Sequence, residues 1–188
     1  MSTLLKTLVM GLAFISTASM AQLSQFTGWE AGANVNFNDA KSESGSTSTS
    51  DKNTGVSLHG GYGMAINNDY AILLGLDMAL DKIKSGEGDK ASLYFKSPYS
   101  LTVAPAMLLN DNTLLYVKVS YESAKFNFST TTKDINGYGL GVGARYILSK
   151  GIYLQAELKG ITYNQFQLNG YDVNSSNSQI NIGAGFNF

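Results

Sequence analysis

Few residues in this sequence have side chains suited to catalysis. His59 is the only histidine, and the chain contains no cysteine. An enzymatic interpretation would make His59 a general base supported by Asp77. No serine or cysteine, however, stands in a nucleophile motif that matches such a base. We therefore interpret His59 as a member of a buried ion-pair network and expect that the protein is not an enzyme.

The remaining candidates are charged residues that alternate with apolar ones. When alternate positions are assigned to the two faces of each strand, one face collects the ionisable residues. They are Glu30, His59, Asp77, Asp81, Lys118, Glu122, Arg145, Glu157 and Lys159. An isolated buried ion costs several kcal/mol, so we expect these groups to meet as acid–base pairs that fill the lumen of a barrel.

A metal or nucleotide site is not indicated by these residues. One histidine and no cysteine leave only carboxylates as ligands, and Asp77 and Asp81 lie about 13 Å apart along a strand that rises about 3.3 Å per residue. The glycines of "GYGLGVGAR" (137–145) alternate strictly and lead into a strand, so they do not form a dinucleotide-binding loop. We expect no metal and no cofactor.

The elements that would position these residues are β-strands. Alternation with a period of two recurs along the chain, and no long stretch has the period of an amphipathic helix. The pattern predicts an all-β fold of eight strands. They span roughly 26–38, 54–66, 70–83, 91–109, 113–127, 136–148, 152–166 and 178–188.

The connections between these strands fall into two classes. "NND" (67–69), "NDN" (110–112) and "SKG" (149–151) are tight turns, whereas 39–53, 84–90, 129–135 and 170–176 are polar stretches. We expect the long stretches to be mobile, water-exposed loops. Short turns on one side and long loops on the other are typical of an eight-stranded antiparallel up-and-down transmembrane β-barrel.

The two faces of the strands indicate which side meets lipid. In the second strand, Val56, Leu58 and Tyr62 share one face while His59 and small residues occupy the other. A soluble barrel would place the apolar face inside and carry many charged residues on its exterior, but only 14% of the residues in the whole chain are charged. The alternative of a soluble periplasmic barrel is therefore disfavoured, and the apolar face is predicted to contact the membrane.

Turn positions predict the register of two hairpins. If the hairpin of the second and third strands turns about Asn68, His59 lies opposite Asp77. The turn at "SKG" brings Arg145 close to Gln155, with Glu157 on the diagonal.

The fourth strand contains Pro98 and Pro105, each of which lacks a donor for the ladder. We expect a bulge there.

The N-terminal residues have the pattern of an export signal. Lys6 precedes the apolar run "LVMGLAFI" and then "STASMA", whose Ser19 and Ala21 fit the cleavage rule. We expect a cleaved signal peptide at 1–21 and a barrel domain at 22–188, exported to the outer membrane of a Gram-negative bacterium. Thirteen basic residues, one of them Lys6, stand against 14 acidic ones, so no nucleic-acid partner is expected.

Aromatic residues and the last strand add to this interpretation. Trp29, Tyr62, Tyr70 and Tyr146 fall near strand ends on the outward face, where an interfacial girdle is expected. With "GYGLGVGARYIL" and the terminal "INIGAGFNF", the chain resembles small outer-membrane barrels of the opacity-protein and outer membrane protein A transmembrane-domain superfamily, a porin-like group. That resemblance implies a final strand read by the barrel-assembly machinery. Its outward positions are Ile180, Ile182, Ala184, Phe186 and Phe188.

The resemblance leaves several functions open. The leading hypothesis is a structural, non-enzymatic barrel whose loops contact a host molecule or another surface at the cell surface, with outer-membrane lipid and lipopolysaccharide around it. The alternatives are a narrow porin-like channel for small solutes or ions and a lipid-modifying enzyme that uses its histidine. No peptidoglycan-binding domain follows the barrel as in outer membrane protein A, so we expect no envelope-tethering role.

Overall fold

A computed structural model describes residues 23–45, 47–88, 91–128, 131–168 and 171–188. The expected signal peptide at 1–21 lies outside the described residues. The elements are η1 (Leu23–Phe26), β1 (Gly28–Ser44), β2 (Thr47–Ala65), β3 (Tyr70–Ala79), β4 (Ile83–Gly88), β5 (Ala91–Asn110), β6 (Thr113–Phe128), β7 (Thr131–Ser149), β8 (Ile152–Tyr163), β9 (Phe166–Leu168) and β10 (Tyr171–Asn187). Within these residues, no helix is long and apolar enough to cross a membrane.

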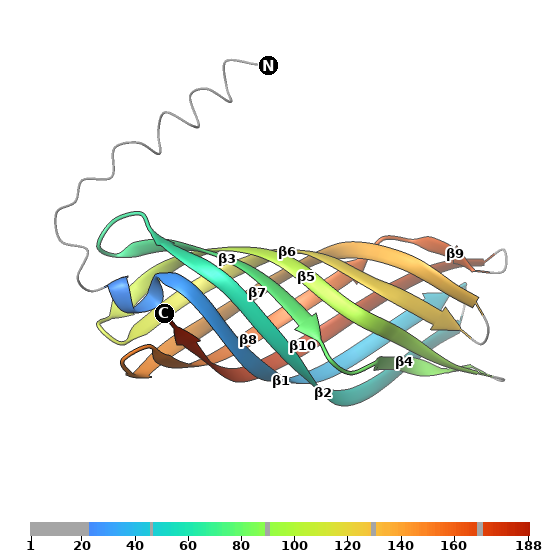
Figure 1. Ribbon diagram of the computed structural model, residues 1–188. Helices are drawn as coiled ribbons and strands as arrows, with labels where there is room; N and C mark the ends of the chain where they lie inside the picture. Colours follow the sequence, from blue (N-terminus) through green and yellow to red (C-terminus); the bar gives the residue numbers. More distant parts are fainter. Residues whose placement is uncertain (1–22, 46, 89–90, 129–130, 169–170) are drawn as a thin grey trace, which may run out of the picture.

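The strands close into an antiparallel barrel, which confirms the predicted fold. Eight of the described strands form the ring in the order β1, β2, β3, β5, β6, β7, β8 and β10, and β10 pairs with β1 to close it. Figure 1 shows the strands tilted across the barrel axis. The even number of ring strands brings β1 and β10 back to the same end, which we call the terminal end.

Tight turns form the rest of the terminal end. In the turn after β2, the Asn67 side-chain Oδ1 accepts hydrogen bonds from the backbone N–H groups of Asp69 and Tyr70, both at 2.9 Å. Such a side chain imitates a backbone turn, so a short "NND" connection suffices. In the turn before β8, Gly151 has a φ of 77°, which favours glycine.

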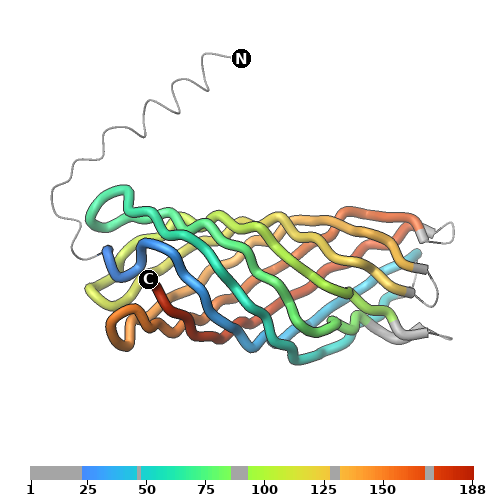
Figure 2. Tube along the Cα trace, in the orientation of Figure 1, coloured from blue at the N-terminus to red at the C-terminus, as the bar shows by residue number. Residues whose placement is uncertain are grey.

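The opposite end, which we call the hairpin end, differs from the expectation. The segment predicted as a loop at 39–53 is strand almost throughout, because β1 and β2 stay in register from Gly28–Gly63 to Ser44–Thr47. The described parts of 84–90, 129–135 and 170–176 are likewise mostly strand. Figure 2 shows the strands continuing to this end of the molecule. The prediction of loops was wrong for the described residues, because Ser and Thr residues that lack apolar alternation still pair as cross-strand neighbours.

At the hairpin end, the ring separates into two sheets. The β2–β3 ladder ends at Ser57–Ala79, and the β7–β8 ladder ends at Gly137–Tyr163. Beyond these pairs, one sheet consists of β2, β1, β10 and β9, and the other of β4, β5, β6 and β7. The barrel therefore grades into a sandwich of two sheets.

The predicted irregularity in the fourth strand of the ring is a bulge in β5. The β5–β6 register shifts between Lys96 and Tyr99, and Ser97 has a φ of 48°. Pro98 lies inside this bulge, where no ladder donor is needed. Pro105, by contrast, stays in register opposite Ile72 of β3.

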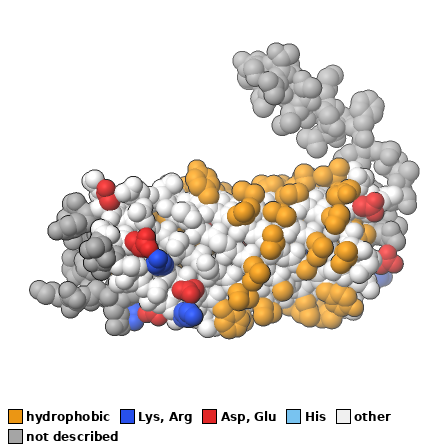
Figure 3. Space-filling view, turned by 180° about the vertical axis from the view of Figure 1, so that it is seen from behind, with side chains coloured by type: hydrophobic (Ala, Val, Ile, Leu, Met, Phe, Trp, Pro, Cys, Tyr) orange, Lys and Arg blue, Asp and Glu red, His pale blue; other side chains and the backbone are white. Residues whose placement is uncertain are grey.

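The outer face carries an apolar band on the half nearer the terminal end. Figure 3 shows hydrophobic side chains gathered over one half of the barrel wall, with charged side chains over the other half and at the rim of the terminal end. On β7, the exposed large hydrophobic side chains run from Tyr138 to Leu148. Ten residues at about 3.4 Å each, tilted by about 40°, give a height of roughly 26 Å. That height matches the lipid-facing band of outer-membrane barrels.

Candidate functional site

The inner face of the barrel holds a layer of charged side chains. Arg145 of β7 reaches across the lumen to Glu30 of β1, whose neighbours in the ring are β2 and β10. The guanidinium Nη2 donates to Glu30 Oε1 at 2.8 Å, Nη1 donates to Glu30 Oε2, and Nε donates to Gln155 Oε1 at 3.2 Å. Such a bidentate contact is among the stronger ion pairs in proteins. The guanidinium also lies 4.7 Å from the centre of the Tyr153 ring.

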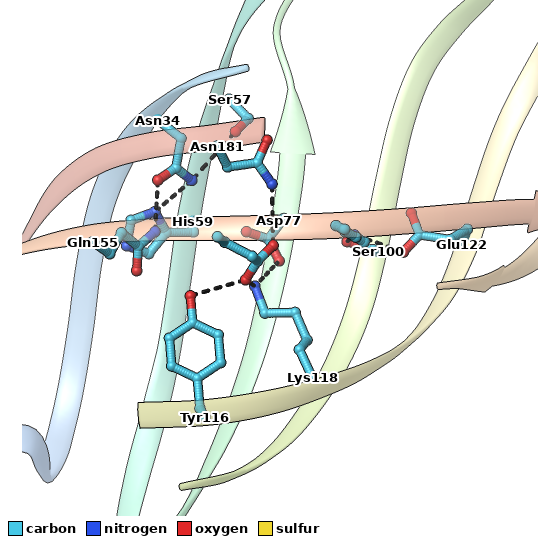
Figure 4. Close-up of polar contacts among 12 residues, drawn as sticks. Asn34, Ser57, His59, Asp77, Ser100, Tyr116, Lys118, Glu122, Gln155 and Asn181 are labelled. Carbon is cyan, nitrogen blue, oxygen red and sulfur yellow. Dashed lines mark hydrogen bonds and ion pairs between the residues drawn. The ribbon is translucent and has the colours of Figure 1, made fainter. Parts of the chain in front are cut away.

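A second ion pair joins β6 to β8. The Lys118 ammonium lies 2.6 Å from Glu157 Oε2 and 3.8 Å from Asp77 Oδ2. Glu157 also accepts hydrogen bonds from the Tyr116 hydroxyl at 2.9 Å and from the Asn181 amide at 3.1 Å. Figure 4 shows these side chains converging from different strands. Each oxygen of the buried Glu157 carboxylate therefore has a donor.

A third pair lies toward the hairpin end. Lys159 of β8 lies 2.7 Å from Glu122 of β6, and its ammonium contacts the Ser100 hydroxyl at 3.4 Å. Lys159 and Glu122 are 7% and 4% exposed. Each of the three basic residues in this layer thus has a carboxylate partner, as the cost of burying a lone ion requires.

His59 belongs to the same layer but forms no catalytic arrangement in the described residues. It lies opposite Asp77 in the ladder, as the turn position predicts. Its hydrogen bonds nevertheless go elsewhere: Nε2 lies 2.7 Å from the Tyr153 hydroxyl, and Nδ1 lies 3.2 Å from the Asn34 amide nitrogen. The Asp77 carboxylate instead faces Lys118. The ring of His59 is therefore held by a phenol and an amide rather than by a nucleophile and an acid.

Glycines on the inner face make room for the large side chains. A Cβ on Gly143 would lie 2.4 Å from the Tyr116 ring, and one on Gly185 would lie 2.4 Å from the Tyr153 ring. Contacts this short do not occur in folded proteins, so larger residues would displace these rings. The alternating glycines of the sequence are therefore packing positions for the polar layer.

An apolar cluster seals the lumen at the terminal end. Leu23 and Phe26 of η1 are fully buried and pack in one cluster with Leu73, Tyr116 and Tyr153. The short helix is thereby held as a plug beneath the charged layer.

A second apolar cluster fills the hairpin end between the two sheets. The Phe95 ring stacks on Tyr163 at 5.0 Å between centres, and Phe126 contacts Phe166 at 4.9 Å. Ile83 of β4 belongs to the same cluster. The charged layer thus lies between two apolar seals, with cavities of about 50 and 20 Å³ reaching it.

The predicted site residues separate into three groups in the structure. Seven of the nine charged positions are buried in the lumen: Glu30, His59, Lys118, Glu122, Arg145, Glu157 and Lys159. Asp77 is partly exposed but faces the same layer. The prediction that Asp81 belongs to the buried network was wrong. Asp81 follows the end of β3, is exposed, and accepts a hydrogen bond from the Val56 backbone N–H at 2.8 Å.

The outward residues lie where the alternation places them. Trp29 and Tyr62 are exposed near the terminal end and form an edge-on pair with ring centres 5.1 Å apart. Tyr70 and Tyr146 are exposed as well. In the last strand, the outward side chains are those of Ile180, Ile182, Ala184, Phe186 and Phe188.

Two features of the site could not be found by pairing neighbouring strands. The Arg145–Glu30 contact crosses the lumen between strands that are not adjacent. The cluster at the hairpin end contains inward aromatic residues such as Phe95 and Phe126. The sequence feature that could have identified them is an aromatic residue at an inward-facing position of the alternation, beyond the apolar band. Among the described residues, no group of three or more His, Cys, Asp or Glu side chains could hold a metal ion.

Comparisons with known proteins agree with this architecture. Neisserial surface protein A is 17% identical, with a TM-score of 0.55 over 86% of this chain and 98% of that chain. The outer membrane protease OmpT of Escherichia coli is 8% identical, with a TM-score of 0.52 over 85% and 96%. Ail, the attachment invasion locus protein of Yersinia pestis, is 18% identical, with a TM-score of 0.49 over 85% and 99%.

The likenesses to Neisserial surface protein A and to OmpT show the fold alone, because both identities are low. No curated protein matched the sequence. The family model described as the outer membrane protein beta-barrel domain matches residues 8–188. The chain therefore belongs to the outer-membrane β-barrel protein family and is a transmembrane barrel of the outer membrane.

Proposed function

We propose that the protein is a closed, non-enzymatic outer-membrane barrel that presents its hairpin end to ligands outside the cell. The observation that supports this proposal is that buried apolar clusters lie on both sides of the paired charges. A conducting pore needs a continuous water path, and the two seals interrupt it.

The hairpin end has the features of a recognition surface. Its strands run past the apolar band, so this part of the barrel stands in water when the band is in lipid. Exposed charges there often cancel in pairs between facing strands, as for Lys52 with Asp39 at 3.9 Å and Lys125 with Asp134 at 3.2 Å. Recognition would therefore rest on hydroxyl and amide groups more than on net charge.

The orientation and surroundings complete the proposal. The short turns of the terminal end would face the periplasm and the hairpins the outside, with lipopolysaccharide around the outer rim. A cleaved signal at 1–21 would export the chain, and the barrel-assembly machinery would read the outward row of the last strand.

Planar-bilayer recording tests the closed lumen. Purified barrel inserted into a bilayer should give no steady conductance. A well-defined conductance from most inserted molecules would overturn this proposal. The surface role is tested separately by binding of intact cells to host cells or extracellular matrix with and without the protein, and equal binding would count against it.

A narrow channel is the second candidate, favoured by the cavities that reach the charged layer. In that case Glu157→Gln and Arg145→Met should change the ion selectivity of whatever current is seen. A current that neither substitution affects would not pass through this lumen.

A lipid-modifying enzyme is the least supported candidate. His59 is buried between Tyr153 and Asn34 and is not presented to the outer leaflet. The substitution His59→Ala should leave the composition of the envelope lipids unchanged, and a changed acylation pattern would restore the enzymatic hypothesis.

A further inference from the structure

A groove crosses the outer wall of the barrel where the apolar band ends on the hairpin side. Its volume is about 770 Å³, within the roughly 300–1,000 Å³ that is typical of ligand sites. Its exposed lining residues form two registered rows over four adjacent strands, β8, β10, β1 and β2. The row nearer the terminal end is Leu158, Ile180, Phe37 and Thr54, and the row nearer the hairpin end is Gly160, Ser178, Asp39 and Lys52.

Small residues create the hollow in the second row. Gly160 and Ser178 are ladder partners at neighbouring positions of the wall. A Cβ on Gly160 would meet no described atom within 4 Å. This glycine therefore differs from those of the inner face, because it leaves open space on the outside rather than room for a neighbouring ring.

The groove lies at the boundary between the apolar band and the polar hairpin end. Among the described residues, Leu158, Ile180 and Phe37 are the last exposed large apolar residues of their strands before the hairpin end. A wholly apolar molecule would desolvate the charges of the second row without pairing them. A wholly polar molecule would gain nothing from the first row. The two rows together therefore fit an amphiphile whose apolar part points toward the terminal end.

The charges of the second row indicate the kind of polar group. Lys52 Nζ lies 3.9 Å from Asp39 Oδ2, and the two side chains are 84% and 50% exposed. This distance exceeds the roughly 3.2 Å limit of a good N–H···O hydrogen bond, and exposed pairs of this kind contribute little to stability. Both groups can therefore contact a ligand. An anionic head group would be attracted by Lys52 but repelled by Asp39, whereas a zwitterionic one complements both.

We propose that this groove binds one phospholipid with a phosphoethanolamine head group, taken from the leaflet on the hairpin side. The Lys52 ammonium donates to the lipid phosphate, and the lipid ammonium donates to the Asp39 carboxylate. Two carbons join the phosphate and the ammonium of this head group, so both can meet the pair at once. The acyl chains lie along Leu158 and Ile180 in the apolar band. Binding here depends neither on the closed lumen nor on recognition of a ligand outside the cell.

The test is lipid retention counted by native mass spectrometry. The full barrel in a non-ionic detergent is mixed with equal amounts of phosphatidylethanolamine and phosphatidylglycerol that carry the same acyl chains. One phosphatidylethanolamine should be retained per barrel, at least about tenfold more often than phosphatidylglycerol. Equal retention of the two would mean unselective contact with the band and would overturn the proposal. Displacement by an equal amount of lipopolysaccharide would overturn it as well, because lipopolysaccharide would then be the occupant.

One variant tests the hollow itself. Gly160→Leu places a large side chain in the open space and should abolish retention of the lipid. Thr162→Leu, at the next outward position of β8 and outside the groove lining, is the matched control and should retain it. Native retention in Gly160→Leu would show that the lipid binds elsewhere on the wall.

The charged pair is tested by reversal. Lys52→Glu leaves two acidic groups and should reduce the preference for phosphatidylethanolamine to less than about twofold. Combining Asp39→Lys with Lys52→Asp exchanges the two charges and should restore the preference. Lys125→Ala, which breaks the exposed pair with Asp134, is the control and should leave it unchanged. A preference that survives Lys52→Glu would refute the proposed head-group contacts.

Discussion

The Arg145–Glu30 ion pair allows a quantitative test of the charged lumen. Both residues are buried, at 5% and 6% exposure, and the guanidinium donates to both carboxylate oxygens. The substitution Arg145→Met keeps a long side chain but leaves the Glu30 carboxylate without its counter-charge. Breaking a buried pair from one side costs about 3–5 kcal/mol. That loss is a large share of the roughly 5–15 kcal/mol by which folded domains are stable.

The double variant separates the pair from the packing. When Glu30→Gln accompanies Arg145→Met, no unpaired charge is left in the lumen. Replacing a whole buried pair is often close to neutral, so the double variant should recover at least about 2 kcal/mol relative to Arg145→Met alone.

The measurement uses the single tryptophan. Trp29 is exposed on the lipid-facing side and is the chain neighbour of Glu30, so its fluorescence reports the transfer from lipid to water on unfolding. Denaturant unfolding in lipid vesicles then gives the free energies of unfolding. Asp134→Asn, which breaks an exposed pair with Lys125, should cost less than about 1 kcal/mol and is the control. A loss below about 1 kcal/mol for Arg145→Met, or a double variant no more stable than it, would refute the reasoning.

Three further outcomes follow from packing and from the last strand. Gly143→Ala should destabilise the barrel by about 1–3 kcal/mol because the new Cβ would lie against the Tyr116 ring, whereas Gly160→Ala, whose Cβ meets nothing within 4 Å, should be neutral in the same unfolding assay. Equal effects of the two substitutions would contradict the packing argument. Phe95→Ala in the hairpin-end cluster should cost about 3–5 kcal/mol, and a cost below about 1 kcal/mol would show that this seal is loosely packed. Phe188→Ser should lower the amount of assembled barrel in outer-membrane fractions, measured by heat-dependent gel mobility, and unchanged assembly would falsify the role of this residue as a signal.

Local patterns were sufficient to predict the barrel and part of its register. Alternation fixes which residues of a strand share a face, so the outward row through Leu58 and the inward position of His59 could both be assigned. The turn at 67–69 then determines that His59 lies opposite Asp77. The bulge at Ser97 and Pro98 was also predictable, since proline cannot donate to a ladder.

Contacts across the lumen could be identified only from the structure of the closed barrel. Arg145 was expected near Gln155 and Glu157 because these residues belong to the neighbouring strand, and the Gln155 contact is present. Its main partner, Glu30, comes from the other side of the ring, and its position depends on the barrel's shear and width. Likewise, the continuation of β1 through Ala40 and Ser42 was missed because polar residues on both faces give no hydrophobic alternation.

The continuation of the strands into the hairpin end has a consequence for immune recognition and for variation. Because Ser44 and Thr47 are ladder partners, a molecule that binds this end would meet strands that are already paired and would not have to pay for pairing them. Antibodies raised against the folded barrel should therefore recognise shape more than linear peptide. Ser44 and Thr47 also lie far along their strands from Glu30 and His59 of the charged layer, so substitutions at these two positions should act almost independently of barrel stability. With the hairpin end outside the cell, as proposed, such an arrangement would let the outer surface diversify while the membrane-embedded part stays the same.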